Sequence, residues 1–132
     1  MKRFFIILFM FLFAITSPVL ATEQKDLDLL NAVQLGDKAK VEQLLNEGAD
    51  PNVSTPQHSA IHLSVFLPDS SILKLLIEKG GDVNLIDSAD FTPIMYAATV
   101  YNIDMVNFLL EKGADPAFEN KLGISAYDMA IS

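Results

Sequence analysis

The 132-residue sequence contains no cysteine. A disulfide framework and cysteine redox chemistry are therefore excluded, and no thiol is present to carry a lipid anchor. The folded chain must be stabilised by packing alone.

Arginine is almost absent, since Arg3 is the only one. Lys2 and Arg3 are the charged residues among the first 21, so residues 22–132 contain seven lysines, no arginine and all seventeen acidic residues. Their formal net charge is −10. Charge of this sign repels phosphate backbones and anionic membrane surfaces. We therefore expect no nucleic-acid partner, and a protein partner with basic character.

Residues 1–21 have the three-part pattern of a secretory signal peptide. Two basic residues precede an apolar run over residues 4–15, and Val19 and Ala21 are small residues at the third and first positions before the expected cut. A membrane-spanning helix needs about 20 apolar residues, so this run is short for an uncleaved anchor, which is the alternative. We predict cleavage after Ala21 and a mature domain in the periplasm or outside the cell, away from the membrane.

One phrase occurs three times, as LLNEGAD, LLIEKGGD and LLEKGAD. The glycines Gly48, Gly80 and Gly113 are 32 and 33 residues apart. Before each glycine, apolar residues recur in steps of three and four, which predicts a helix that ends at a glycine cap. Self-similarity at this period is typical of a solenoid.

A second phrase follows each copy and starts with a hydroxyl residue, at Ser59, Thr92 and Ser125. Serine and threonine are good helix N-caps, and Pro93 is placed at a first helical position, where its missing N–H costs little. Each unit therefore reads as a turn, a short helix and a longer helix.

The phrases TPIMYAA (residues 92–98) and LLNEGADPN (residues 44–52) resemble the two signatures of the ankyrin repeat. The resemblance runs from about residue 26 to residue 132. It implies an all-α solenoid of helix-turn-helix units with β-hairpin-like loops. We place the units at about 26–52, 53–84, 85–117 and, for a partial fourth unit, 118–132. Unit 1 has no hairpin before it and reads as an N-terminal capping repeat.

His58 and His62 are four residues apart and are the candidate metal ligands. Ser59 follows His58 where a zinc-protease motif needs glutamate, and His58 is expected in a loop. The resemblance implies that His62 is structural, with its ring bonded to backbone and hydroxyl groups. We therefore predict no metal, no cofactor and no enzyme activity. A metal-dependent enzyme that uses both histidines is an alternative.

Two sets of acidic residues have a different interpretation. Asp50, Asp82 and Asp115 recur in every unit, which indicates a structural role in the turn, since catalysis needs one site. Asp87 and Asp90 lie on one loop, and paired carboxylates can do acid–base chemistry. No nucleophile is placed near them, so we expect solvated loop acids.

The resemblance implies that a partner binds the concave face, at the hairpin tips and at the ends of the short helices. Exposed apolar area and aromatic anchors favour binding there. Packing of Leu35, Phe66 and Val100 against the next unit is the alternative. The expected contact residues, which should share one face, are Leu35, His58, Phe66, Leu67, Ile86, Ser88, Ala89, Phe91, Val100 and Tyr101.

Together these patterns predict a monomeric, exported, non-catalytic protein-binding module. It is similar to the small periplasmic ankyrin proteins of Gram-negative bacteria. That resemblance implies a role in supporting an exported enzyme or as an immunity protein against a toxin. A secreted effector that binds a host protein is the alternative.

Overall fold

The computed structural model describes residues 19–132. Most of the expected signal peptide, residues 1–18, lies outside the described residues. Residues 19–34 are helical, so the expected cleavage position at Ala21 lies within a helix that continues into unit 1. Within residues 19–132, no helix combines the length and apolar character needed to cross a membrane.

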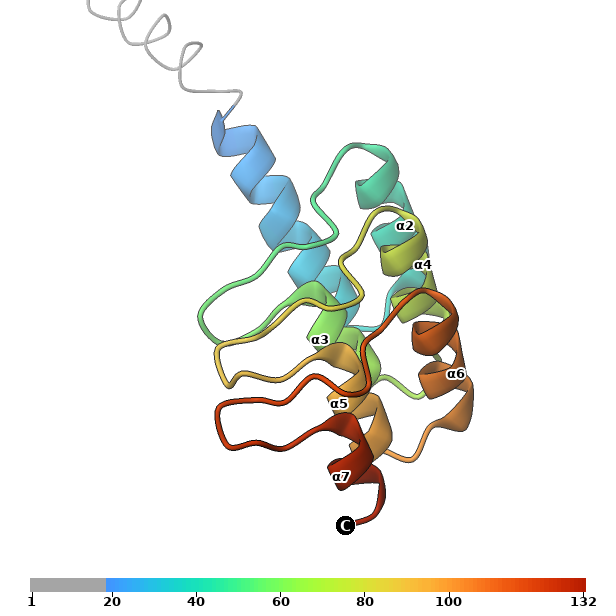
Figure 1. Cartoon of the computed structure of the whole chain (residues 1–132). Coiled ribbons are helices and arrows are strands. Elements are labelled where there is room, and N and C mark those ends of the chain that lie inside the picture. Colours follow the sequence, from blue (N-terminus) through green and yellow to red (C-terminus); the bar gives the residue numbers. More distant parts are fainter. Residues whose placement is uncertain (1–18) are drawn as a thin grey trace, which may run out of the picture.

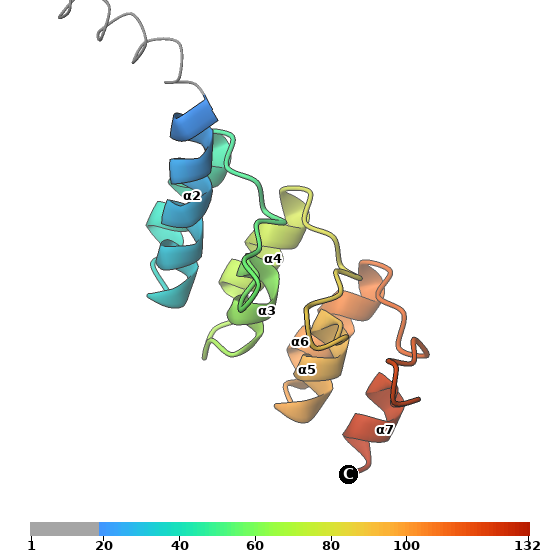
Figure 2. The same ribbon diagram turned by 90° about the vertical axis from the view of Figure 1, so that its left-hand side faces the viewer.

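Six further helices follow. The first helix and the next five form three pairs, the last helix stands alone among the described residues, and long loops project to one side of them (Figure 1). The pairs stack one below the next along the molecule (Figure 2). The helices are α2 (Lys38–Asn46), α3 (Ala60–Val65), α4 (Ser71–Glu78), α5 (Pro93–Thr99), α6 (Ile103–Glu111) and α7 (Ala126–Ala130). Among the described residues the β-structure is a single bridge between Ser54 and Ser59. The prediction of an all-α ankyrin-type solenoid is therefore confirmed.

Helix starts follow the polar residues that the sequence places before them. The side chains of Asp37, Ser59, Asn102 and Ser125 each accept a hydrogen bond from the backbone N–H three residues later. Such an N-cap satisfies a donor that the helix itself leaves free, and contributes about 1 kcal/mol.

The three recurring glycines end the longer helices as predicted. Their φ angles are 93° at Gly48, 101° at Gly80 and 92° at Gly113. Residues with a Cβ rarely adopt this left-handed conformation, which explains why the phrase keeps glycine in every copy.

The longer helices bury the apolar residues that recur in steps of three and four before each glycine. Leu44, Leu73, Leu76 and Leu109 are nearly or wholly inaccessible to solvent. α4 packs on both α2 and α3, and α5 contacts α3, α6 and α7. One continuous core therefore runs through the stack, and burial of each large side chain contributes about 1.5–3 kcal/mol.

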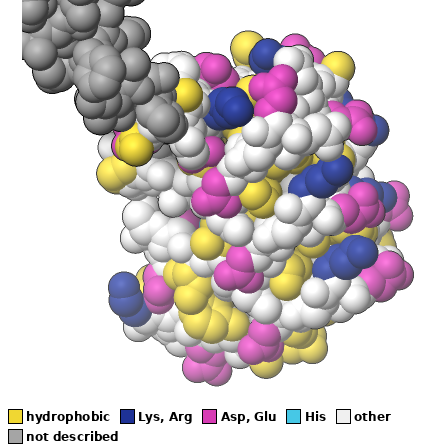
Figure 3. All heavy atoms as spheres, turned by 90° about the horizontal axis from the view of Figure 1, so that it is seen from above, with side chains coloured by type: hydrophobic (Ala, Val, Ile, Leu, Met, Phe, Trp, Pro, Cys, Tyr) yellow, Lys and Arg dark blue, Asp and Glu magenta, His cyan; other side chains and the backbone are white. Residues whose placement is uncertain are grey.

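The outer side of α2, α4 and α6 is a solvated, charged surface. Figure 3 shows lysine and acidic side chains interleaved on this side. The ammonium groups of Lys74 and Lys112 lie 5.7 and 5.5 Å from the ring centre of Phe108, and Lys79 donates to Asn46. These three lysines are engaged within the chain.

Candidate functional site

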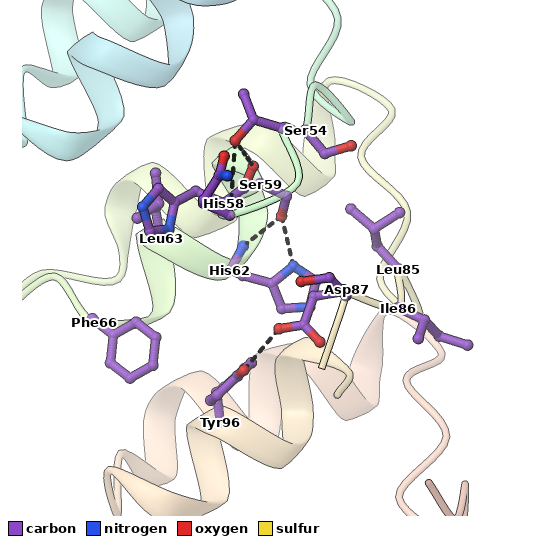
Figure 4. A pocket seen from close by; sticks show the side chains of 13 residues that line it. Ser54, His58, Ser59, His62, Leu63, Phe66, Leu85, Ile86, Asp87 and Tyr96 are labelled. Carbon is purple, nitrogen blue, oxygen red and sulfur yellow. Dashed lines mark hydrogen bonds between the residues drawn. The ribbon is translucent and has the colours of Figure 1, made fainter. Parts of the chain in front are cut away.

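A hollow of about 150 Å³ opens on the loop side, between units 2 and 3 (Figure 4). It is enclosed by the loop before α3, by α3 itself, by the loop before α5 and by one side chain of α5. Its lining residues are Ser54, Thr55, Gln57, His58, Ser59, His62, Leu63, Phe66, Leu85, Ile86, Asp87, Ser88 and Tyr96.

The floor of the hollow is the ring of His62, which is bonded at both nitrogens. Its Nδ1 atom lies 2.6 Å from Oγ of Ser59, and its Nε2 atom lies 3.0 Å from the carbonyl oxygen of Phe91. A carbonyl can only accept, so Nε2 carries the proton and Nδ1 accepts from the Ser59 hydroxyl. Burial lowers the pKa of His62 below its ordinary value, although the charge of Asp87 and the backbone bonds act in the opposite direction. The ring is therefore neutral at neutral pH.

The Ser59–His62 pair resembles a nucleophile and its base, but its geometry is that of a structural cap. Ser59 Oγ also accepts from the backbone N–H of His62 at 3.1 Å, as the N-cap of α3. Both side chains are buried. The bond from His62 to Phe91 joins unit 2 to unit 3, so the expected structural role of this histidine is confirmed.

Asp87 forms the wall of the hollow. Its Oδ1 atom accepts from the backbone N–H groups of Ala89 and Phe91, at 3.0 and 2.9 Å. Its Oδ2 atom accepts from the Tyr96 hydroxyl at 2.7 Å, as Figure 4 shows. Burial, followed by the hydrogen bond and charge of Asp87, raises the pKa of Tyr96 to about 12. The carboxylate thus ties its loop to α5.

Asp90 joins the loops of units 3 and 4. Its Oδ2 atom accepts from the backbone N–H of Lys121 at 2.6 Å, and the Lys121 ammonium lies 3.9 Å from Oδ1. The expectation that Asp87 and Asp90 are solvated loop acids is therefore wrong. Sequence spacing did not reveal that each has a backbone or hydroxyl donor within reach.

The rim of the hollow is apolar and exposed. Phe66 is 57% exposed and Ile86 is 48% exposed. The Phe66 ring meets the edge of Tyr96 at a centroid distance of 5.2 Å, which holds it over the hollow. Exposed aromatic and aliphatic side chains around a depression are the usual anchors of a protein interface.

Four of the ten predicted contact residues line this hollow, namely His58, Phe66, Ile86 and Ser88. Ala89 is exposed on the same loop. His58 is in the loop before α3, as expected, and is exposed. Within the described residues no cluster of three or more potential metal ligands occurs.

Phe91 is placed differently from the prediction. It is half-buried, packs against the core, and stacks on Tyr96 with a centroid distance of 5.2 Å and an interplanar angle of 30°. Phe91 therefore contributes to the packing of unit 3 and is less exposed than a contact residue at a hairpin tip would be. The residue before a helix-starting threonine looked like an exposed tip, but its loop folds back onto α5 through Asp87.

The remaining predicted residues do not share the face of the hollow. Tyr101 lines a separate groove with residues of α6 and α7, so the expectation of one common face is wrong for it. Leu35 lies just beyond the first helix, and Val100 caps the end of α5. Leu67 is half-buried beside unit 1. Leu35 and Val100 remain exposed, so packing against the next unit does not account for them.

Sequence reasoning missed Tyr96, Asp87 and Leu85 as lining residues. Tyr96 is four residues after Thr92, so it lies one helical turn into α5 and projects toward the preceding unit. The spacing between Thr92 and Tyr96 could therefore have predicted that Tyr96 lines the hollow. The acid that Tyr96 contacts lies nine residues earlier on a loop, and no periodic pattern predicts such a pair.

The recurring aspartates have the role that their recurrence predicted. Asp50, Asp82 and Asp115 each accept from the backbone N–H two residues later, at 2.8 to 2.9 Å. This is the Asx-turn arrangement, which fixes the bend after each glycine.

Comparison with known proteins supports the same architecture. A profile of ankyrin repeats in three copies matches residues 29–120. An ankyrin repeat and LEM domain-containing protein 1 homolog of Caenorhabditis elegans is 39% identical over 80 residues, which are 58% of this chain and 11% of that protein. The human transient receptor potential cation channel subfamily A member 1 is 34% identical over 94 residues, 70% of this chain and 8% of the channel.

A third relative is the ADP-ribosylation factor GTPase-activating protein AGD4 of Arabidopsis thaliana, which is 27% identical over 113 residues, 80% of this chain and 15% of that protein. The chain spans only a small part of each relative's length, and the three are eukaryotic. The likeness to bacterial periplasmic proteins therefore stays a prediction. Because the profile covers more than half of the chain and the helix pairs repeat with its period, the chain belongs to the ankyrin repeat family.

Proposed function

We propose that the chain is an exported adaptor that binds a protein segment in the hollow between units 2 and 3. Ankyrin repeats indicate a protein–protein interaction module. The observation that carries the proposal is the exposed apolar rim of Phe66 and Ile86 around a hollow whose floor is fixed by hydrogen bonds.

The partner segment presents an apolar side chain to this rim. The polar groups of Ser54, His58 and Ser88 surround the hollow and are available to the segment's backbone. The net charge of −10 on residues 22–132 favours a segment with basic flanks, because opposite charge speeds encounter. The floor groups are already paired within the chain, so the segment does not have to supply partners for them.

Two variants test the site. Ile86→Lys places a cation on the rim and should weaken the complex at least about tenfold, as expected for loss of an interface anchor. Leu27→Lys is the matched control, because Leu27 is 49% exposed against 48% for Ile86 but lies on the first helix. Binding of the partner, isolated on the unmodified protein, is measured by calorimetry. Equal affinity of both variants would place the interface elsewhere.

Export is a separate part of the proposal, and rests on the pattern of residues 1–21. The mature protein is then expected to begin at Thr22 and to be monomeric. Mass spectrometry of the periplasmic fraction tests the cut, and a mass that includes residues 1–21 contradicts it. Light scattering tests the monomer.

Two biological roles suit an exported adaptor, and enzymology separates them. A chain that supports an exported enzyme leaves the partner active in the complex. An immunity protein inhibits its partner. The partner's activity with and without the adaptor therefore decides between them.

A further inference from the structure

The hollow between units 2 and 3 contains a negative charge that no lysine balances. Among the described residues that line it, Asp87 is the one acid and none is a lysine. Asp87 is half-buried, beside His62 and Tyr96 (Figure 4). No lysine of the described chain lies within ion-pair distance of it, whereas Asp90 on the same loop has the Lys121 ammonium at 3.9 Å. The hollow is therefore complementary to a cation.

His62 does not supply that cation. Both of its ring nitrogens are bonded within the chain, and burial lowers the pKa of the ring, so it is neutral at neutral pH. The same bonds leave the ring no nitrogen for a metal ion, and no cluster of three potential metal ligands occurs among the described residues. An organic cation therefore suits the hollow better than a metal ion.

The hydrogen bonds of Asp87 leave room for one more donor. Its Oδ1 atom accepts from the N–H groups of Ala89 and Phe91, and its Oδ2 atom accepts from the Tyr96 hydroxyl. The two oxygens of a carboxylate offer about four acceptor sites, so one site on Oδ2 is open. One site takes a single bond from a lysine ammonium but not the two parallel bonds of an arginine.

The size and the walls of the hollow match one long side chain. A cavity of about 150 Å³ accepts a molecule as large as benzene, so the hollow admits one side chain but not a helix. A lysine packs its stem along apolar surface while its ammonium stays among polar groups. Phe66 and Ile86 supply the apolar surface, and the hydroxyls of Ser54 and Ser88 are further acceptors in the lining.

We propose that the hollow binds a lysine side chain of the partner segment, with the stem against Phe66 and Ile86 and the ammonium at Asp87. This inference rests on the proposed function and adds the residue type that the site selects. The apolar side chain that contacts the rim is then a neighbour of this lysine in the segment. Asp87 thus has a role in specificity besides tying its loop to α5.

The probe is Nα-acetyl-lysine methylamide, which has the lysine side chain between two peptide groups. Nα-acetyl-norleucine methylamide is the neutral comparison, because its side chain lacks only the amine. NMR titrations report binding through the backbone N–H signals of Ala89 and Phe91, which are bonded to Asp87. The lysine probe should bind the unmodified chain at least about tenfold more tightly at low salt, and the difference should shrink as salt is added.

Asp87→Asn tests the carboxylate. Asparagine keeps a side-chain oxygen for the N–H groups of Ala89 and Phe91 but removes the charge, so the lysine probe should lose about tenfold in affinity and bind like the norleucine probe. Asp90→Asn is the matched control, because it makes the same change of charge on the same loop, at a residue outside the lining. It should keep the preference for lysine. Circular dichroism confirms that both variants are folded.

Three results would overturn the proposal: equal affinity of the lysine and norleucine probes for the unmodified chain, tighter binding of Nα-acetyl-arginine methylamide than of the lysine probe, or a preference for lysine that survives Asp87→Asn. None of them bears on the proposed function, which the partner's affinity for the Ile86→Lys variant tests separately. Equal affinity of the partner for Ile86→Lys and Leu27→Lys, with the lysine preference of the probe intact, would overturn the proposed function alone, because the hollow would then serve a different amine.

Discussion

The side-chain oxygen of Asn84 accepts a hydrogen bond from the backbone N–H of Asp115 at 2.9 Å, and so joins the end of unit 2 to the turn that ends unit 3. Its side-chain N–H group donates to the carbonyl of Gly113 at 3.2 Å. One unit earlier, Asn52 accepts from the N–H of Asp82 at 2.6 Å. The asparagines of the first two phrases, Asn52 and Asn84, thus link successive units, whereas the third phrase has Ala117 at this position. The repeated phrase therefore does more than end a helix.

Asn84→Ala should lower the free energy of unfolding by about 1–2 kcal/mol, because it removes two hydrogen bonds and leaves backbone groups of the next turn without their partner. Asn107→Ala is the matched control, since Asn107 is an exposed residue of α6. It should change stability by less than about 0.5 kcal/mol. Urea denaturation measures both, and an equal loss in the two variants would show that the link contributes nothing.

Leu76→Ala should lower the free energy of unfolding by about 2–5 kcal/mol, because Leu76 is fully buried between helices. The free energy of unfolding of a small domain is only about 5–15 kcal/mol, so a large fraction of the Leu76→Ala variant should be unfolded at moderate temperature. Leu109→Ala should behave alike. Leu27→Ala, at a half-exposed leucine of the first helix, is the control. Thermal melts followed by circular dichroism give the comparison, and a loss below about 1 kcal/mol for Leu76→Ala would contradict the register of α4.

The scaffold was predictable from sequence because its causes are local and repeated. A helix that ends at Gly80 needs a left-handed residue in each copy, and a helix that begins after Ser59 needs a side-chain acceptor there. Such requirements repeat at the same spacing in each unit, so three copies reinforce one another. The apolar stripes of α4 and α6 follow from the 3.6-residue period alone.

The site was less predictable because its contacts differ from unit to unit. Asp87 meets Tyr96 only because the loop before α5 folds back, and unit 2 has neither residue at the matching positions. Phe91 is drawn into this contact and becomes half-buried. Which side chains meet across a loop depends on how the loop folds, and the sequence does not show this. Phe91 therefore looks like an exposed loop residue in the sequence but packs against its neighbours in the structure.

Unit 3 has no counterpart of the side-chain hydrogen bond between Ser59 and His62 in unit 2. Met95 stands where unit 2 has His62, and the Thr92 hydroxyl is buried without a hydrogen-bond partner, unlike Ser59. Ser59→Ala should therefore cost about 1–3 kcal/mol, since it removes a cap and leaves a buried ring nitrogen unpaired. Thr92→Val should be neutral or stabilising, because it removes only an unpaired polar atom. Chemical denaturation ranks the two, and a larger loss for Thr92→Val would show that its hydroxyl has a partner in solution.

Acid should destabilise the chain through His62 in a window that begins near neutral pH. Burial lowers the pKa of His62 in the folded state below 6.5, whereas the unfolded chain keeps the ordinary value. Below about pH 6.5 the unfolded state therefore binds the extra proton and is favoured, so the free energy of unfolding falls as pH falls. Hydrogen bonds lower the pKa of Asp69 and Asp128 from 3.8. Protonation of these carboxylates therefore reduces the free energy of unfolding only below about pH 4.

The measurement is urea denaturation at intervals from pH 7.5 to 5. The unmodified chain should lose stability through this range, and His62→Gln should have a flatter profile even though it starts less stable. His58→Gln is the control, because it removes an exposed histidine of the adjoining loop and leaves His62 in place. Asp87→Asn should steepen the fall, since burial lowers the pKa of His62 and the charge of Asp87, together with backbone hydrogen bonds, acts against that lowering. If the unfolding free energy of His62→Gln falls as steeply with pH as that of the unmodified chain, protonation of the His62 ring is not the cause of the acid destabilisation.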